Sequence, residues 1–198
     1  GIVVAWLAGV RPKFFIYSAV AMIALLPIAI SFLKPYQKSR ILTFLNPERD
    51  PLGAGYQIIQ SKIAIGSGGL FGKGFLNGSQ SYLDYLPEKH TDFIFTLFSE
   101  EFGFFGSLFI LLLYALIISR IIRIGNMTRS NFGKLYCYSF ATAFFIYVVV
   151  NMMMVLGLLP IVGSPLPIMS NGGSSMLAIM LGLGIVMSCK ISKDVPVN

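Results

Sequence analysis

Charged residues are scarce in this sequence. They make up 12% of its 198 residues, whereas soluble domains contain about 25%. Hydrophobic residues account for 56% of the chain, and the mean hydropathy is +0.78. This composition excludes an ordinary soluble domain. It predicts an all-α, polytopic transmembrane helical bundle, because a helix satisfies its own backbone hydrogen bonds in lipid.

Histidine and cysteine are also nearly absent. The chain has one histidine, His90, and two cysteines, Cys137 and Cys189, which lie within apolar runs. Zinc sites need three or four such ligands at short spacings, so the sequence predicts no metal centre built from them. We interpret the two cysteines as small apolar side chains of the helix interior.

The net charge of +7 does not indicate a nucleic-acid partner. A face that binds nucleic acid combines clustered basic residues with exposed aromatic ones, and the sequence has no such stripe. Cytoplasmic loops of membrane proteins carry the same basic excess. We therefore expect membrane lipids around the chain and no nucleic acid.

Long apolar runs divide the chain into spans. A helix needs about 20 apolar residues to cross a hydrocarbon core about 30 Å thick, so residues 1–10 are expected to be the end of a truncated span. The chain would then be the C-terminal part of a larger bundle. The predicted complete spans are 14–33, 102–119, 135–159 and 176–189, and the intervening outer loops are 34–101 and 160–175.

Basic residues predict the orientation of these spans. Short loops rich in lysine and arginine face the cytoplasm, and such clusters occur at 11–13, 120–134 and 190–193. The loops at 34–101 and 160–175 should then lie outside. We predict a multi-pass membrane protein whose functional face is extracytoplasmic.

The acidic residues are concentrated in the first outer loop. Residues 46–101 contain seven of the eight acidic side chains, and a charge within the hydrocarbon costs about 3 kcal/mol. We therefore expect the chemistry of the protein in this loop. Its densest group of titratable residues is Glu88, Lys89, His90 and Asp92.

Asp92 is the main candidate in this group. If a helix begins near Thr91 and continues into the next span, Asp92 shares one face with Thr96, Ser99 and Gly103. A polar stripe descending from a carboxylate suits a cavity open to a lipid headgroup. The alternative is that Asp92 only complements the dipole of a helix N-terminus and that His90 is only hydrogen-bonded. Of the two glutamates at the boundary, Glu100 lies closer to the Asp92 face than Glu101 does.

Two other parts of this loop have alternative interpretations. Residues 55–66 place Tyr56, Ile59 and Ile63 on one helical face, which suits a helix in the headgroup plane or a packed surface helix. The glycine-rich residues 66–74, beside Lys62 and Lys73, form either an anion cradle or a simple tight turn. The spacing of these glycines does not match a P-loop or a dinucleotide-binding loop.

Several stretches carry a family resemblance. The segments DPLGAGYQIIQSKIAIGSGGLFGKG, SQSYLDYLPEKHTDFIF and EEFGFFG resemble the corresponding parts of the SEDS family, and SPLPIMSNGGSS resembles its closing outer loop. The resemblance covers nearly the whole chain and is closer to elongation-type members than to division-type ones. One departure is Asn171, where the family usually has tyrosine, and this affects aromatic packing there. The missing N-terminal spans would contribute further polar and basic residues to the cavity.

The resemblance implies an integral peptidoglycan glycosyltransferase that polymerises lipid II outside the cytoplasmic membrane during cell elongation. It also implies a class B penicillin-binding protein as transpeptidase partner. The aspartate of the HTDFIF stretch, here Asp92, is the residue that the family needs for polymerisation. The candidate substrate-binding residues are Arg49, Gln60, Lys62, Lys73, Glu88, Lys89, His90, Glu100, Ser170 and Ser174.

The chemistry of lipid II is compatible with a single essential carboxylate. Glycosidases use two carboxyl groups because the leaving alkoxide must be protonated, whereas a pyrophosphate is already a good leaving group. Asp92 would act as general base in a single displacement. The pyrophosphate would be stabilised by Arg49, Lys62, Lys73 or Lys89, or by a bound Mg²⁺ or Mn²⁺, so a cofactor is left open.

Two other functions are open at this point. A lipid II flippase would need polar residues along a path through the membrane, and the spans contain little beyond Asn151 and a few serines and threonines. The second alternative is a non-catalytic, partner-binding remnant of a split gene.

Overall fold

A computed structural model describes residues 12–46, 50, 53–78 and 91–191. Within these residues every regular element is an α-helix, so the predicted all-α class is confirmed. The helices are α2 (Pro12–Ser31), α3 (Pro35–Leu45), α4 (Ala54–Gly68), α6 (Ile94–Met127), α7 (Asn131–Val155) and α8 (Gly173–Ile191).

Three helices in the described part of the chain, α6, α7 and α8, are long and apolar enough to cross a membrane. The predicted span 102–119 lies within α6, and 176–189 lies within α8. Helix α7 ends at Val155, before the predicted boundary at 159, because the following residues turn back at the positive φ of Gly157. Helix α2 contains most of the predicted span 14–33.

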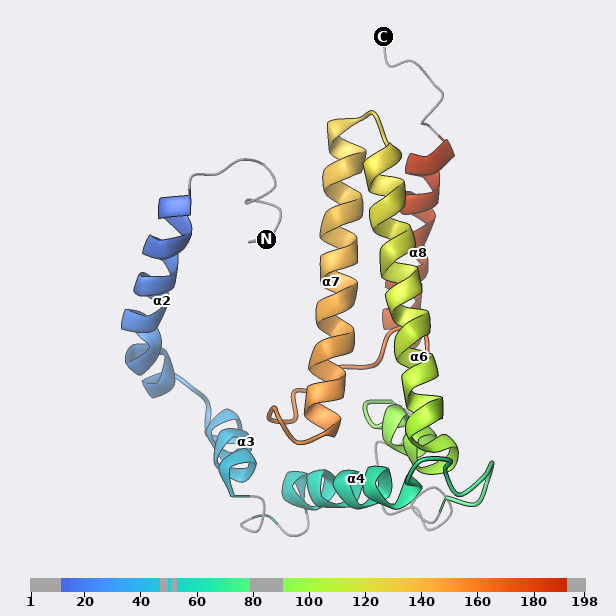
Figure 1. Cartoon of the computed structure of the whole chain (residues 1–198). Coiled ribbons are helices and arrows are strands. Elements are labelled where there is room, and N and C mark those ends of the chain that lie inside the picture. Colours follow the sequence, from blue (N-terminus) through green and yellow to red (C-terminus); the bar gives the residue numbers. More distant parts are fainter. Residues whose placement is uncertain (1–11, 47–49, 51–52, 79–90, 192–198) are drawn as a thin grey trace.

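The long helices α6, α7 and α8 lie side by side, while α2 stands apart from them (Figure 1). The main core lies between α6, α7 and the loop that follows α7, around buried Tyr114, Phe144 and Val148. The Tyr114 hydroxyl donates to the carbonyl oxygen of Pro167 at 2.6 Å. A second, smaller cluster includes fully buried Cys137.

Helix α4 lies across the end of this bundle (Figure 1). Its buried side chains include those of Ile58, Ser61 and Ala64, at a spacing of three residues, which places them on one side of the helix. Ile59 and Ile63 of the expected apolar face are 37% and 52% exposed, which agrees with a helix in the headgroup plane rather than with a packed surface helix. On the packed side, the small side chains of Ser61 and Ala64 let α4 approach α6 closely, and Ile58 joins the main core.

Helix α6 is broken at Gly103. This residue has φ 67° and ψ −160°, a conformation available essentially to glycine alone. The break exposes main-chain groups, and the glycine-rich segment after α4 pairs with them. The Phe104 amide donates to the Gly69 carbonyl at 2.9 Å, and the Lys73 amide donates to the Glu100 carbonyl at 3.0 Å.

This geometry corrects the expected polar stripe. Helix α6 begins at Ile94, so Asp92 precedes it, and the break at Gly103 ends the common face. Thr96 and Ser99 are 0% and 2% exposed. They serve helix packing, because Thr96 bonds the Ser61 hydroxyl at 2.8 Å and Ser99 accepts from Ser107 at 2.9 Å.

Candidate functional site

Asp92 lies in a turn at residues 91–93, directly before α6. Two buried side chains hold the main chain of this turn. The Asn151 amide donates to the Asp92 carbonyl at 2.8 Å, and the Ser170 hydroxyl donates to the Thr91 carbonyl at 2.5 Å. The turn is therefore fixed to α7 and to the loop between α7 and α8.

The side chain of Asp92 points toward Gly163. A Cβ built on Gly163 would lie 3.4 Å from Asp92 Oδ2, and the φ of this glycine is +70°. Asp92 itself is half-buried. The backbone thus passes close to the carboxylate, while part of the residue stays accessible to a substrate.

Gly163 also lines a cavity of about 350 Å³ between α7, α8 and their connecting loop. Its other lining residues are mainly apolar or aromatic, among them Phe144, Tyr147 and Ala178. The same glycine therefore lies next to the carboxylate and also lines an apolar cavity. This arrangement suits a substrate with a polar head and an apolar tail.

Two basic side chains reach the same loop. Lys62 of α4 lies against Gly157, and Arg40 of α3 donates from Nη1 to the Ile161 carbonyl at 2.8 Å. Residues 157–163 thus carry contacts with one carboxylate and two cations. Such a group suits an anionic substrate, because arginine and lysine both bind phosphate oxygens. Arg40 was not predicted as a site residue, because its one sequence signal is its position in the outer loop.

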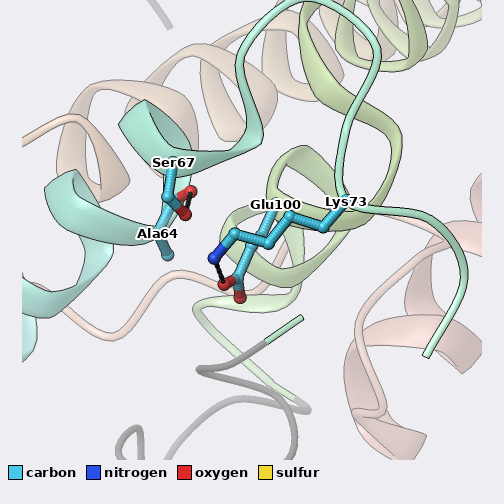
Figure 2. Close-up of polar contacts among 4 residues, drawn as sticks. All are labelled: Ala64, Ser67, Lys73 and Glu100. Carbon is cyan, nitrogen blue, oxygen red and sulfur yellow. Dashed lines mark hydrogen bonds and ion pairs between the residues drawn. The ribbon is translucent and has the colours of Figure 1, made fainter. Parts of the chain in front are cut away.

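Lys73 and Glu100 form an ion pair of 2.7 Å, with Glu100 fully buried (Figure 2). Two amides of the glycine-rich segment, those of Lys73 and Gly74, donate to main-chain carbonyls of α6. Because these donors are used, the structure favours the tight-turn interpretation of this segment over the anion cradle. The ion pair and the amides join the segment to the broken part of α6.

The remaining candidates occupy different positions. Gln60 is half-buried on α4, and Ser174 is exposed in the first turn of α8. Ser170 is buried and holds the Asp92 turn. Four candidates, Arg49, Glu88, Lys89 and His90, lie outside the described residues.

Among the residues that the structure describes, no three His, Cys, Asp or Glu side chains are placed to hold a metal ion. The turn at residues 91–93 offers a divalent cation one carboxylate ligand, that of Asp92. Mg²⁺ commonly binds through one or two carboxylates together with substrate phosphates, and Asp92 supplies one carboxylate. A divalent cation here would thus depend on the substrate for most of its ligands.

Comparison with known proteins identifies the family. Residues 1–194 match the Cell cycle protein family of FtsW, RodA and SpoVE. The chain belongs to this family, the SEDS family. It is 49% identical to the peptidoglycan glycosyltransferase MrdB of Escherichia coli K12 over 189 residues, which cover 95% of this chain and 51% of MrdB. It is 46% identical to the peptidoglycan glycosyltransferase RodA of Treponema pallidum, covering 81% of this chain and 37% of that protein.

Solved SEDS structures have the same fold. A chain of a peptidoglycan synthase complex that coordinates polymerisation and crosslinking matches 98% of this chain with a TM-score of 0.80 and 32% identity, over 54% of its own length. RodA of Thermus thermophilus matches 98% of this chain with a TM-score of 0.55 and 25% identity, over 62% of its length. The chain thus spans about half the length of its relatives and is the C-terminal part of a membrane-embedded SEDS fold.

Proposed function

We propose that the chain carries the catalytic aspartate of a peptidoglycan glycosyltransferase that polymerises lipid II during cell elongation. One observation carries the proposal: Asp92, Lys62 and Arg40 all contact the loop at 157–163. The relatives MrdB and RodA of this chain are named peptidoglycan glycosyltransferases. MrdB is 49% identical to the chain, whereas the probable FtsW of Trichlorobacter lovleyi is 42% identical to it.

In the proposed reaction, Asp92 accepts the proton of the acceptor sugar's 4-hydroxyl group. The hydroxyl oxygen forms a bond with the anomeric carbon of the donor, and the bond from that carbon to the pyrophosphate breaks. The lipid pyrophosphate leaves with the bonding electrons, so no acid is needed to protonate it. The accessible part of Asp92 and its main-chain bonds support this role, because a general base must reach the proton it removes.

Lys62 and Arg40 are the proposed partners of the departing pyrophosphate. Both are exposed and both lie at the loop that Asp92 touches, so they would offset the negative charge that develops as the bond breaks. Lys73 is less suited to this role, because it pairs with Glu100. A Mg²⁺ or Mn²⁺ ion shared with the pyrophosphate is an alternative to the two side chains.

The proposed site faces the outside of the bacterial cytoplasmic membrane. In the described part of the chain, the basic residues at the opposite end of the bundle, from Arg120 to Lys134 and at Lys190, are exposed, as expected for a cytoplasmic end. We propose a class B penicillin-binding protein as partner. The structural neighbour that coordinates polymerisation and crosslinking within one complex supports this pairing.

The test uses a full-length chimera in which the N-terminal half of MrdB is joined to this chain. Purified chimera receives lipid II in detergent, and glycan chains are separated by gel. We expect Asp92→Asn to abolish the chains, while Asp50→Asn, the same change beside the N-terminus of α4, leaves them intact. Normal polymerisation by Asp92→Asn would show that Asp92 is not the general base. The remnant alternative is tested by mixing this chain with the N-terminal half of MrdB as a separate chain. Absence of glycan chains from both this mixture and the chimera would support a non-catalytic remnant.

A lipid II flippase is less well supported. Three polar side chains of the bundle, Thr96, Ser99 and Asn151, are buried and bonded within the protein. They line no polar path in the described part of the chain. Transport of lipid II without polymerisation by the chimera would favour this second candidate.

A further inference from the structure

We infer that Asn151 is a positioning residue for Asp92. Its side-chain amide fastens the turn that carries the carboxylate to the loop that carries Gly163. The inference rests on the proposed role of Asp92 as general base, and it assigns a function to a polar residue near the C-terminal end of the apolar helix α7.

The geometry of the amide supports this role. Asn151 is fully buried, and its Nδ2 donates to the Asp92 carbonyl at 2.8 Å and to the Ser164 carbonyl at 2.6 Å. An amide group has two N–H donors, so both are used. Asp92 lies 59 residues and Ser164 lies 13 residues away in the sequence. One nitrogen atom therefore fixes the relative position of two distant segments that meet at the proposed site.

The oxygen atom of the same amide lacks a partner in the residues described, which lowers the stability of the fold. Asn151 Oδ1 is buried, and it has no hydrogen-bond partner within the described part of the chain. An unsatisfied buried acceptor lowers stability, and local rules of this kind are broken mainly at functional sites. A residue present only for packing would not need an unpaired oxygen in an apolar helix. The two bonds of Nδ2 are thus the feature that explains the asparagine.

Ser170 provides a second, independent tether on the same turn. Its hydroxyl donates to the Thr91 carbonyl at 2.5 Å and accepts from the Leu166 amide at 2.7 Å. The turn is therefore held at two successive carbonyls, from two different elements. Together these bonds fix the direction of the Cα–Cβ bond of Asp92 and hence the place of its carboxylate beside Gly163.

Loss of this positioning should act on the chemical step. Removing the amide of Asn151 frees the Asp92 turn from α7, and a displacement of about 1 Å at a catalytic group costs about 10²-fold in rate. Asn151→Leu should lower kcat for lipid II polymerisation by about 10- to 100-fold. The KM for lipid II should change by less than about twofold, because Asn151 is buried and touches no substrate.

The experiment compares variants of the full-length chimera with lipid II in detergent. Asn151→Leu is paired with Asn126→Leu. The Asn126 side chain lies at the end of α6 far from Asp92, and its Oδ1 accepts a hydrogen bond from the Tyr138 hydroxyl. Ser170→Ala is paired with Ser170→Thr, which keeps the hydroxyl group. We expect kcat to fall in Asn151→Leu and Ser170→Ala, and to stay within about twofold in Asn126→Leu and Ser170→Thr. Thermal unfolding of each variant is followed in parallel, so that rates are expressed per folded molecule.

Two results would overturn the inference. One is a kcat per folded molecule for Asn151→Leu within twofold of the unaltered chimera. The other is an equal loss in Asn126→Leu, which would indicate a general effect on the bundle. Asp92→Asn separates this failure from that of the proposed function: if Asp92→Asn is inactive while Asn151→Leu is fully active, only the positioning role is wrong. If Asp92→Asn is active, the base itself is wrong.

Discussion

Asp92 and Glu100 are two carboxylates close in sequence that the structure uses in opposite ways. Glu100 is fully buried, and its carboxylate is paired with Lys73 at 2.7 Å. Asp92 is half-buried beside Gly163, and Asn151 holds its main chain. Sequence alone made both of them candidates for the site. Burial separates them, because a carboxylate spent on an internal ion pair is poorly placed to meet a substrate.

The largest difference between the two should appear in activity. In the chimera, Asp92→Asn should lower kcat for lipid II polymerisation by about 10²- to 10⁴-fold, the usual contribution of a general base. Glu100→Gln should retain kcat per folded molecule within about threefold, because this side chain lies inside the protein. The measurement is the initial rate of glycan formation. Equal rates for Asp92→Asn and Glu100→Gln would show that the two carboxylates do not differ in their contribution to catalysis.

The region of Glu100 should instead be sensitive to backbone changes. Gly103→Ala places a Cβ at φ 67°, where it overlaps main-chain atoms of Leu70 and Gly72. Strain of this kind costs about 1–3 kcal/mol, and the overlap adds to it. We expect a free energy of unfolding lower by about 3 kcal/mol or more, measured by denaturation in detergent. Gly66→Ala is the control, since a Cβ there meets nothing within 4 Å and alanine favours a helix.

Glu100→Gln should also destabilise the protein, though less than Gly103→Ala. Breaking a fully buried ion pair costs about 3–5 kcal/mol. The side chain of Lys73 is 30% exposed, so it can turn toward solvent, and glutamine can still accept a hydrogen bond. We therefore expect a loss of about 1–3 kcal/mol, from the cost of an unsatisfied buried group. In a double-mutant cycle, Lys73→Met should cost much less when Glu100→Gln is already present. If the stability losses of Lys73→Met and Glu100→Gln were additive, the ion pair would contribute nothing to the free energy of unfolding.

The coarse features of the fold follow from composition and apolar runs. Low charge and long apolar segments predicted an all-α membrane protein, and α6, α7 and α8 have the required length. The break in α6 was not predicted. Gly103 was placed on a regular helical face, because nothing local shows that residues 69–74 supply its missing partners. That pairing joins segments far apart in the sequence, which local patterns do not register.

The candidate site was predicted in part, through the residues whose chemistry is visible in the sequence. Asp92 stands out because charges are rare in this chain. Arg40 and Asn151 acquire their roles only from distant partners, the Ile161 carbonyl and the Asp92 carbonyl. Asn151 had one usable signal, because a polar residue inside a span is commonly functional. For α4, the exposure of Ile59 and Ile63 agrees with the headgroup-plane interpretation, whereas the packed side with Ile58, Ser61 and Ala64 depends on contacts with distant segments and was not predicted.

The smallest predicted effect concerns Ser61, which joins the two regions. Its hydroxyl bonds Thr96 at 2.8 Å and donates to the Val155 carbonyl at 2.7 Å, inside the contact of α4, α6 and α7. A hydroxyl has one hydrogen, so Thr96 must donate when Ser61 donates to Val155. Ser61→Ala leaves Thr96 and the Val155 carbonyl without these partners, which should lower the free energy of unfolding by about 1–2 kcal/mol.

The matched control for this change is Ser67→Ala on the same helix. The Ser67 hydroxyl donates to the Ala64 carbonyl of its own helix (Figure 2). Ser67 lies at an exposed position, so loss of its hydroxyl should change stability by less than about 0.5 kcal/mol. The Ser61 hydroxyl bonds α4, which carries Lys62, to α6, which follows Asp92. Its removal should therefore also loosen the placement of the cation relative to the base. We therefore expect Ser61→Ala, but not Ser67→Ala, to lower kcat per folded molecule by a few-fold. Equal kcat values in both variants would confine Ser61 to stability and leave the Asn151 and Ser170 bonds as the positioning contacts of Asp92.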